Sequence, residues 1–155
     1  MKRDIPKCFL NLDETKLLAL LGYGEARGEL EKYPGSALGV MSVAMTRAKE
    51  AQAGRTTWWG KTLREVILKP KQFSCFNPSD PNYVGLMAIA GNWDRAYQKN
   101  SVLRECRRLA EGVINGDFPD NVFGATHYNT KKCDPKWDDN MRLTAVIGNH
   151  EFFAK

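Results

Sequence analysis

Apolar residues that recur every three or four positions predict four helices in the first three-quarters of the chain. Capping residues support three of them: Asp13 or Thr15 precedes the first helix, Ser36 precedes the second, and Gly116 follows the last. The four predicted helices cover Lys16–Leu21, Ala37–Ala53, Thr62–Leu68 and Ser101–Ile114.

Two central segments carry weaker signals. Residues 71–83 are rich in proline, asparagine and aspartate, which predicts an ordered loop whose first part, Gln72–Phe76, suits a short strand. Residues 82–99 contain many apolar positions, but Gly85 and Gly91 weaken the prediction of a helix there.

The last forty residues have a different composition. The segments Val122–Tyr128 and Leu143–Phe153 are rich in β-branched and aromatic residues and are flanked by glycine, asparagine and aspartate, which predicts a small β element. The expected class is α+β, mainly helical. A length of 155 residues suits a single domain over residues 1–155.

The chain carries 23 basic and 18 acidic residues, a net charge of +5. This excess suits an anionic partner such as nucleic acid, an acidic membrane or a cell-wall polymer, but it also suits simple solubility. Met1–Arg3 resembles the start of a signal peptide, but Asp4 and Pro6 interrupt the apolar core that should follow. We therefore expect no secretory signal.

Four cysteines, Cys8, Cys75, Cys106 and Cys133, stand far apart in the sequence. No pair has the spacing of a zinc ribbon, and without a secretory signal reduced thiols are expected.

The segment Gly22–Glu29 combines three glycines with two glutamates. Three glycines in a helix cost about 3 kcal/mol relative to alanine, so we expect either the helix to end here or a close approach to its backbone. On a helix, Glu25 and Glu29 would share one face, and their repulsion would favour a protonated carboxyl, the group that glycosidic cleavage requires. The alternative is a solvated helix end at which Arg27 pairs with one glutamate.

Four further blocks of the sequence support a functional role for this segment. With Gly24–Glu29 (GEARGE), the blocks Val40–Arg47, Gln72–Cys75 (QFSC), Ala125–Tyr128 (ATHY) and Ile147–Phe153 resemble, in order, the SleB/CwlJ-type cell-wall hydrolases. The likeness spans roughly residues 15–153. The departures from the family pattern are Thr46, Asn129 and Phe153, and Asn129 argues against a catalytic duty at its position.

The resemblance implies a lysozyme-like, lytic-transglycosylase-like domain that cuts the glycan strands of peptidoglycan without a cofactor or metal. It implies Glu25 as the catalytic acid and a 1,6-anhydro product from the bond between N-acetylmuramic acid and N-acetylglucosamine. A hydrolytic muramidase is the alternative, with Glu29 as the nearest candidate base, although its spacing suits a modulator of Glu25 better.

Other polar residues of the matching blocks are candidates for binding substrate. Tyr128 can donate a hydrogen bond near the developing charge, and Gln72 can bind a sugar, while Ser74 and His127 have no derived acid role. Each also suits a satisfied polar group in the interior. The tryptophans can stack on sugar rings or simply pack in the core: Trp58, Trp59, Trp93 and Trp137.

Three rival readings remain open. Cys75 could be a nucleophile with His127 as its base, as in enzymes that cut wall peptides. His127 and His150 could bind a metal with a further ligand. The chain could also be a non-enzymatic basic module for the wall or for nucleic acid.

The expected setting follows from the resemblance and the apparent lack of a leader. We expect a monomeric phage endolysin that accumulates in the host bacterial cytoplasm and acts on the wall after the membrane is breached. Its partner would be peptidoglycan rather than nucleic acid, with the positive charge helping to hold it on an anionic wall.

Overall fold

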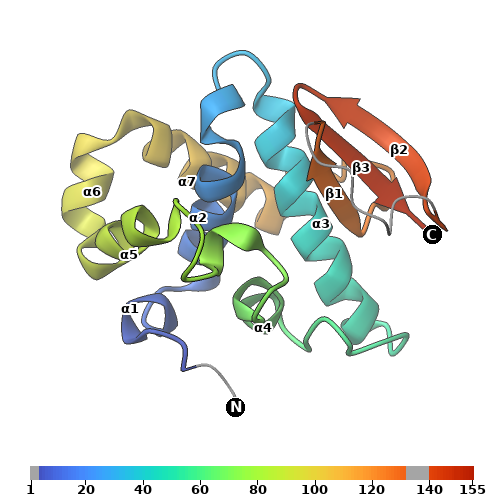
Figure 1. Ribbon diagram of the computed structural model, residues 1–155, viewed down its shortest axis with the longest axis horizontal. Helices are drawn as coiled ribbons and strands as arrows, with labels where there is room; N and C mark the ends of the chain where they lie inside the picture. The colour runs from blue at the N-terminus through green and yellow to red at the C-terminus, as the bar shows by residue number, and fades with distance from the viewer. Residues whose placement is uncertain (1–3, 132–139) are drawn as a thin grey trace.

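The computed structural model describes residues 4–131 and 140–155. Helices occupy most of this part of the chain, and a small sheet lies at one side of them (Figure 1). The helices are α1 (Lys7–Leu10), α2 (Glu14–Ala26), α3 (Pro34–Gln52), α4 (Leu63–Leu68), α5 (Tyr83–Gly91), α6 (Trp93–Lys99) and α7 (Ser101–Asn115), with 3-10 turns η1 (Arg27–Glu29) and η2 (Ser74–Phe76).

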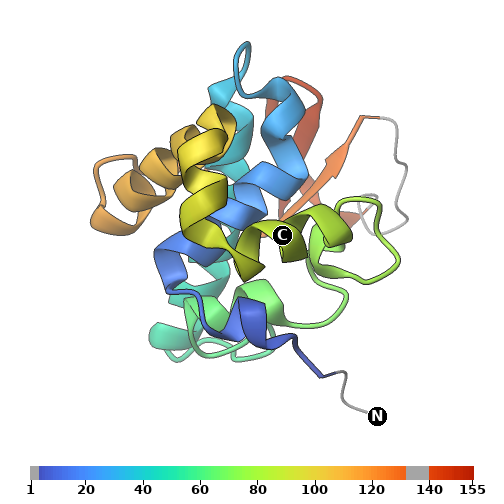
Figure 2. The ribbon, with the colours of Figure 1, turned by 90° about the vertical axis from the view of Figure 1, so that its left-hand side faces the viewer.

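Helix α2 is the centre of the core. Of the two predicted capping residues, Asp13 and Thr15, it is Asp13 that caps the helix, since it accepts a hydrogen bond from the Lys16 backbone N–H at 2.8 Å. The five residues Leu17–Leu21 are fully buried, because α3, α4, α5 and α7 surround the helix (Figures 1 and 2). The prediction that the helix ends near Leu21 is wrong, since it continues to Ala26.

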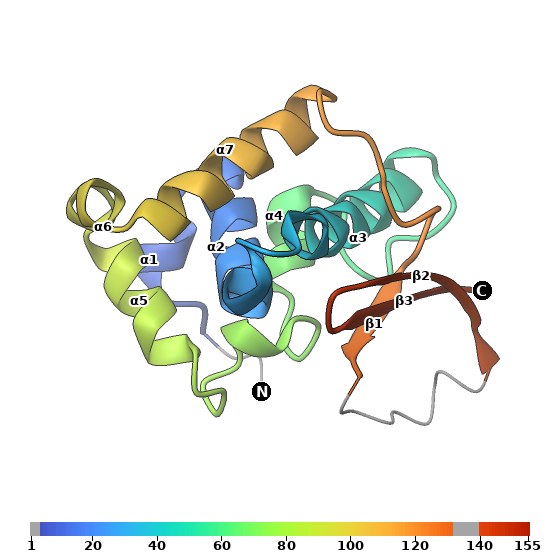
Figure 3. The same cartoon turned by 90° about the horizontal axis from the view of Figure 1, so that it is seen from above.

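Helix α3 lies between α2 and the sheet (Figure 3). It begins at Pro34, three residues before the predicted start, because proline suits the first turn of a helix. Ser36 is therefore not the capping residue. It is buried inside the first turn and donates a hydrogen bond to the Ile147 carbonyl at 2.9 Å, which links α3 to the sheet.

The central segments differ in part from the prediction. Residues 74–76 form a 3-10 turn rather than part of a strand, since Cys75 and Phe76 are both buried and the Cys75 N–H donates to a side chain of α2. Residues 83–99 form two helices, α5 and α6, which break at Asn92. Helix α4 begins at Leu63, one residue after the predicted start, because Thr62 is its capping residue. Helix α7 ends at Asn115, and the residue after it, Gly116, is the predicted cap with a left-handed φ of 84°.

The sheet has the order β1-β3-β2 and is antiparallel, with strands β1 (His127–Thr130), β2 (Arg142–Ile147) and β3 (His150–Ala154). Ile147 pairs with His150, so Gly148 and Asn149 form the turn between β2 and β3. Gly148 has a φ of 56°, as tight hairpin turns require. The sheet packs on α3 through Phe152, which is fully buried. The mainly helical α+β class is confirmed.

In the part of the chain that the structure describes, no helix has both the length and the apolar character needed to cross a bilayer. Cys8, Cys75 and Cys106 carry free thiols, and Cys133 lies outside the described residues.

Candidate active site

A cavity of about 310 Å³ opens where α2, α3, the segment before η2 and strand β1 meet. Glu25, Gln72, Ser74, His127 and Tyr128, five of the six predicted site residues, line it. Three further residues complete the lining: Arg47, Trp58 and Lys71. Segments 100 residues apart in the sequence thus place the residues of separate motifs around one space.

Glu25 lies in the last turn of α2 and is held by donors from η2. Its Oε1 accepts hydrogen bonds from the Ser74 hydroxyl and from the Cys75 backbone N–H, both at 3.1 Å. The Tyr128 hydroxyl lies near enough to this carboxyl group for the two to interact electrostatically. These contacts fix the carboxyl group at the wall of the cavity, so its position does not depend on a flexible side chain alone.

Gly24 explains why η2 can lie so close to α2. A Cβ added at this position would lie 2.7 Å from the Cys75 Cβ and 2.8 Å from its Sγ, distances that side chains do not tolerate. The glycine therefore serves a close approach of the chain to itself, one of the two reasons that the sequence suggested. Gly24 thus allows η2 to lie close enough to α2 to donate its two hydrogen bonds to Glu25.

Tyr128 is a neutral hydrogen-bond donor in this site. Burial raises its pKa well above the usual value, and the nearby Glu25 carboxylate raises it further. Its ring stacks on Phe73 with a centroid distance of 6.3 Å. The hydroxyl therefore keeps its proton at neutral pH and can donate it in a hydrogen bond to Glu25 or to a bound group.

His127 is uncharged at neutral pH. Its pKa is lowered to about 4, mainly by burial and then by the positive charges of Arg47 and Lys155. Its Nδ1 lies 2.9 Å from the Thr126 hydroxyl oxygen. A neutral imidazole in the cavity can hydrogen-bond to a substrate, but it holds no proton to act as an acid at pH 7.

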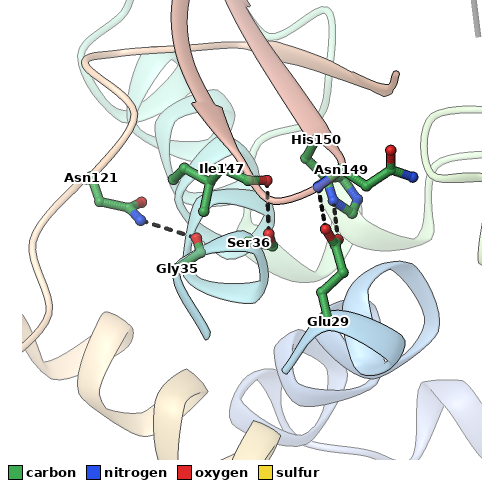
Figure 4. Close-up of polar contacts among 7 residues, drawn as sticks. All are labelled: Glu29, Gly35, Ser36, Asn121, Ile147, Asn149 and His150. Atoms are coloured by element: carbon green, nitrogen blue, oxygen red, sulfur yellow. Dashed lines mark hydrogen bonds and ion pairs between the residues drawn. The ribbon is translucent and has the colours of Figure 1, made fainter. Parts of the chain in front are cut away.

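Glu29 lies outside this cavity, so the prediction that it shares a helix face with Glu25 is wrong. Helix α2 ends at Ala26, and Glu29 belongs to the 3-10 turn η1, which turns its side chain toward the hairpin (Figure 4). There its carboxylate lies 2.5 Å from His150 Nδ1 and accepts a hydrogen bond from the Asn149 N–H. Glu29 thus stabilises the turn between β2 and β3, close to the hydrogen bond that Ser36 donates to the Ile147 carbonyl.

Arg27 does not pair with either glutamate. It donates to the Asn82 side chain at 2.7 Å and lies over the Tyr23 ring at 5.0 Å. The alternative of a solvated helix end with an Arg27 ion pair is therefore also wrong.

The family model described as Cell Wall Hydrolase matches residues 31–153. The chain belongs to the cell wall hydrolase family. The resemblance to the SleB/CwlJ type is thereby confirmed, and the protein is a cell wall hydrolase whose substrate is peptidoglycan. The match includes Arg47 and the three later blocks, and it begins six residues after Glu25. No curated protein and no solved structure matched the chain.

The structure of this cell wall hydrolase argues against a Cys75 nucleophile. The thiol is fully buried beneath Glu25, and burial together with the Glu25 carboxylate raises its pKa well above the usual value. The reactive form of cysteine is the thiolate, which this environment disfavours. Cys75 is also absent from the cavity lining.

The described residues of the hydrolase also offer no group of three histidine, cysteine, aspartate or glutamate side chains that could hold a metal. The two histidines proposed as metal ligands have different surroundings, because His150 contacts Glu29 while His127 lines the cavity.

Three lining residues of the hydrolase were not predicted as site residues. Trp58 was a candidate for sugar stacking, and it is 62% exposed at the edge of the cavity. Arg47 ends the second matching block, so that block held a signal for it. Lys71 has a φ of 67°, a strained conformation that cannot be read from the sequence. Trp59 and Trp93 pack against or within the core, and Trp137 lies outside the described residues.

Proposed function

We propose that this cell wall hydrolase is a glycosidase that cuts the bond between N-acetylmuramic acid and N-acetylglucosamine, with Glu25 as its acid. The observation that carries this proposal is the position of Glu25: among the described residues that line the cavity, it is the sole carboxylate. Glycosidic cleavage needs a carboxylic acid beside the leaving oxygen, and donors around Glu25 hold it in place.

The reaction begins with protonation of the glycosidic oxygen by Glu25. The bond to C1 of the muramoyl residue then breaks, and an oxocarbenium-like centre develops there. Ser74 and the Cys75 N–H stabilise the Glu25 carboxylate that results, because both donate to its Oε1. Gln72 and His127 line the same cavity and would bind the polar groups of the sugars.

We propose a lytic transglycosylase outcome. In this reaction the 6-hydroxyl of the muramoyl residue attacks C1, and Glu25 takes the proton of that hydroxyl to return to its acid form. The nucleophile belongs to the substrate, so one carboxylate serves as acid and then as base. The location of Glu29 supports this outcome over a muramidase with Glu29 as base, since Glu29 is committed to His150 and the hairpin turn.

Mass spectrometry of digested peptidoglycan tests both levels of this proposal. Muropeptides that end in 1,6-anhydro-muramic acid are expected. Reducing muramic acid ends would show that the enzyme is a hydrolytic muramidase rather than a transglycosylase, and the proposal that it is a glycosidase would stand. Free peptides with intact glycan strands would contradict the glycosidase itself.

We also propose that the described fold acts as one catalytic domain, as a monomer, and that its setting is that of a phage endolysin. The net charge of +5 supports electrostatic attraction to anionic wall polymers. Rates of wall clearing should then fall as ionic strength rises. The endolysin role predicts that the protein harms a bacterial host from inside only when a pore-forming partner breaches the membrane.

A further inference from the structure

Arg47 is a buried cation in the cavity of Glu25. Its residue is only 5% exposed, and its Nε donates to the Thr126 carbonyl at 2.9 Å. The guanidinium lies over the rings of Phe73 at 5.0 Å and Trp59 at 5.4 Å. Two aromatic faces and a main-chain carbonyl thus hold it in one orientation.

The charge of Arg47 lacks a counter-ion in the described part of the chain. No carboxylate oxygen there lies within 4 Å of it, and its Nη1 is buried without a hydrogen-bond partner. Burial lowers the pKa of Arg47 from 12.5 to about 10, so it still carries its charge at neutral pH. Removal of a cation from water is strongly unfavourable unless an anion or several hydrogen-bond acceptors compensate for the lost solvation.

The proposed reaction makes this charge harder to accommodate. When Glu25 carries the proton that it must donate, the described lining holds two cations, Arg47 and Lys71, with His127 neutral. The positive centre that then develops on the sugar is matched by the Glu25 carboxylate that forms with it, so the reaction leaves the charges of Arg47 and Lys71 in place. A substrate that brought only neutral groups would leave these positive charges uncompensated in a confined site.

We propose that Arg47 binds a carboxylate of the substrate, carried on the lactyl ether of the muramoyl residue. This inference rests on the proposed function and names the substrate group that the site selects. A planar guanidinium whose Nε is occupied and whose faces are stacked presents its remaining N–H groups edge-on, which suits a carboxylate. The carboxylate has two sources: the lactyl group of a bare glycan strand, or the peptide stem where the lactyl group forms an amide.

Binding measured without turnover tests the inference. In a Glu25→Gln background, dissociation constants are measured by calorimetry for a peptide-free GlcNAc–MurNAc tetrasaccharide and for its twin with the lactyl groups converted to primary amides. The carboxylate form should bind at least about tenfold more tightly. Equal affinity within this pair, together with equal affinity within the muropeptide pair described below, would overturn the proposal, and neither comparison requires a change at Arg47.

Variants then assign the preference to a residue. Adding Arg47→Gln should abolish the difference between the two ligands, while Arg47→Lys should keep part of it. Arg95→Gln, on the exposed surface of α6, is the matched control and should leave it unchanged. Loss of the preference in Lys71→Gln, with full retention in Arg47→Gln, would also overturn the assignment.

A third ligand distinguishes the sources. This ligand is a muropeptide whose lactyl group is amide-linked to the peptide stem, and its affinity is compared with that of the same muropeptide with every stem carboxylate amidated. The first should bind more tightly than the second only if the stem supplies the carboxylate. The outcome is separable from the proposed function, because digestion products report on cleavage. A carboxylate preference with no glycan cleavage would refute the glycosidase and leave the Arg47 site intact.

Discussion

The backbone N–H of Cys75 donates to Oε1 of Glu25 at 3.1 Å, and this bond joins the 3-10 turn η2 to the last turn of α2. It can form because Gly24 has no side chain to hold the two segments apart. The glycine and the glutamate, adjacent in the sequence, therefore act together: one permits the approach and the other receives the donors.

Gly24→Ala should destabilise the fold by about 1–3 kcal/mol, since the new methyl group would overlap Cys75. Gly85→Ala is the matched control, because a Cβ at that position of α5 meets nothing within 4 Å. That change should be neutral or stabilise by up to about 1 kcal/mol. Urea unfolding of both variants measures the difference, and equal effects would contradict the close approach.

Glu29→Gln should lower stability by about 1–3 kcal/mol and leave cleavage by the folded enzyme within about threefold of the parent. The reason is that Glu29 fastens Asn149 and His150 and does not line the cavity. Glu31→Gln, at an exposed position, is the control and should change neither property. A Glu29→Gln variant with normal stability but no activity would contradict this and would indicate a catalytic role for Glu29.

Cys75 should resist alkylation in the folded protein, because burial raises the pKa of its thiol. Peptide mapping after iodoacetamide treatment at pH 8 should find Cys8, which is partly exposed, modified well before Cys75. In urea both should react. Cys75→Ala should still cut glycan strands, and a complete loss of activity in a stable Cys75→Ala protein would revive the thiol mechanism.

His127 should make stability depend on pH between about 4 and 6.5. The unfolded chain binds a proton at its His127 near pH 6.5, whereas the folded protein binds it only near pH 4. Protons therefore favour the unfolded state in this window, and stability falls as the pH is lowered through it. His127→Gln should remove about 1–2 kcal/mol of this dependence, after allowance for the partial exposure of the ring. A His127 imidazole resonance that titrates near pH 6.5 would contradict this.

Much of the fold follows from local signals. Asp13, Thr62 and Gly116 mark helix ends because capping is a short-range interaction that a few residues specify. The 3-10 turn at Ser74–Phe76 could not be foreseen, because its geometry depends on contact with Glu25, some 50 residues away. The same holds for Ser36, whose partner Ile147 lies on the sheet.

The site was predictable where short blocks of polar residues converge, as Gln72, Ser74, His127 and Tyr128 do. Glu29 was misplaced because an i,i+4 spacing constrains two side chains only if the helix continues through both. Arg47 was missed because an arginine late in a helix usually faces solvent, and only the tertiary structure shows the rings of Phe73 and Trp59 around it.

The central claim is that Glu25 supplies the proton for glycan cleavage. The most direct measurement compares the rate at which Glu25→Gln and Glu29→Gln release muropeptides from purified peptidoglycan, with folding checked by circular dichroism. The account predicts that Glu25→Gln folds and loses at least about 10³-fold in rate, while Glu29→Gln remains active. A folded Glu25→Gln enzyme that released muropeptides at a rate close to that of the parent would contradict it.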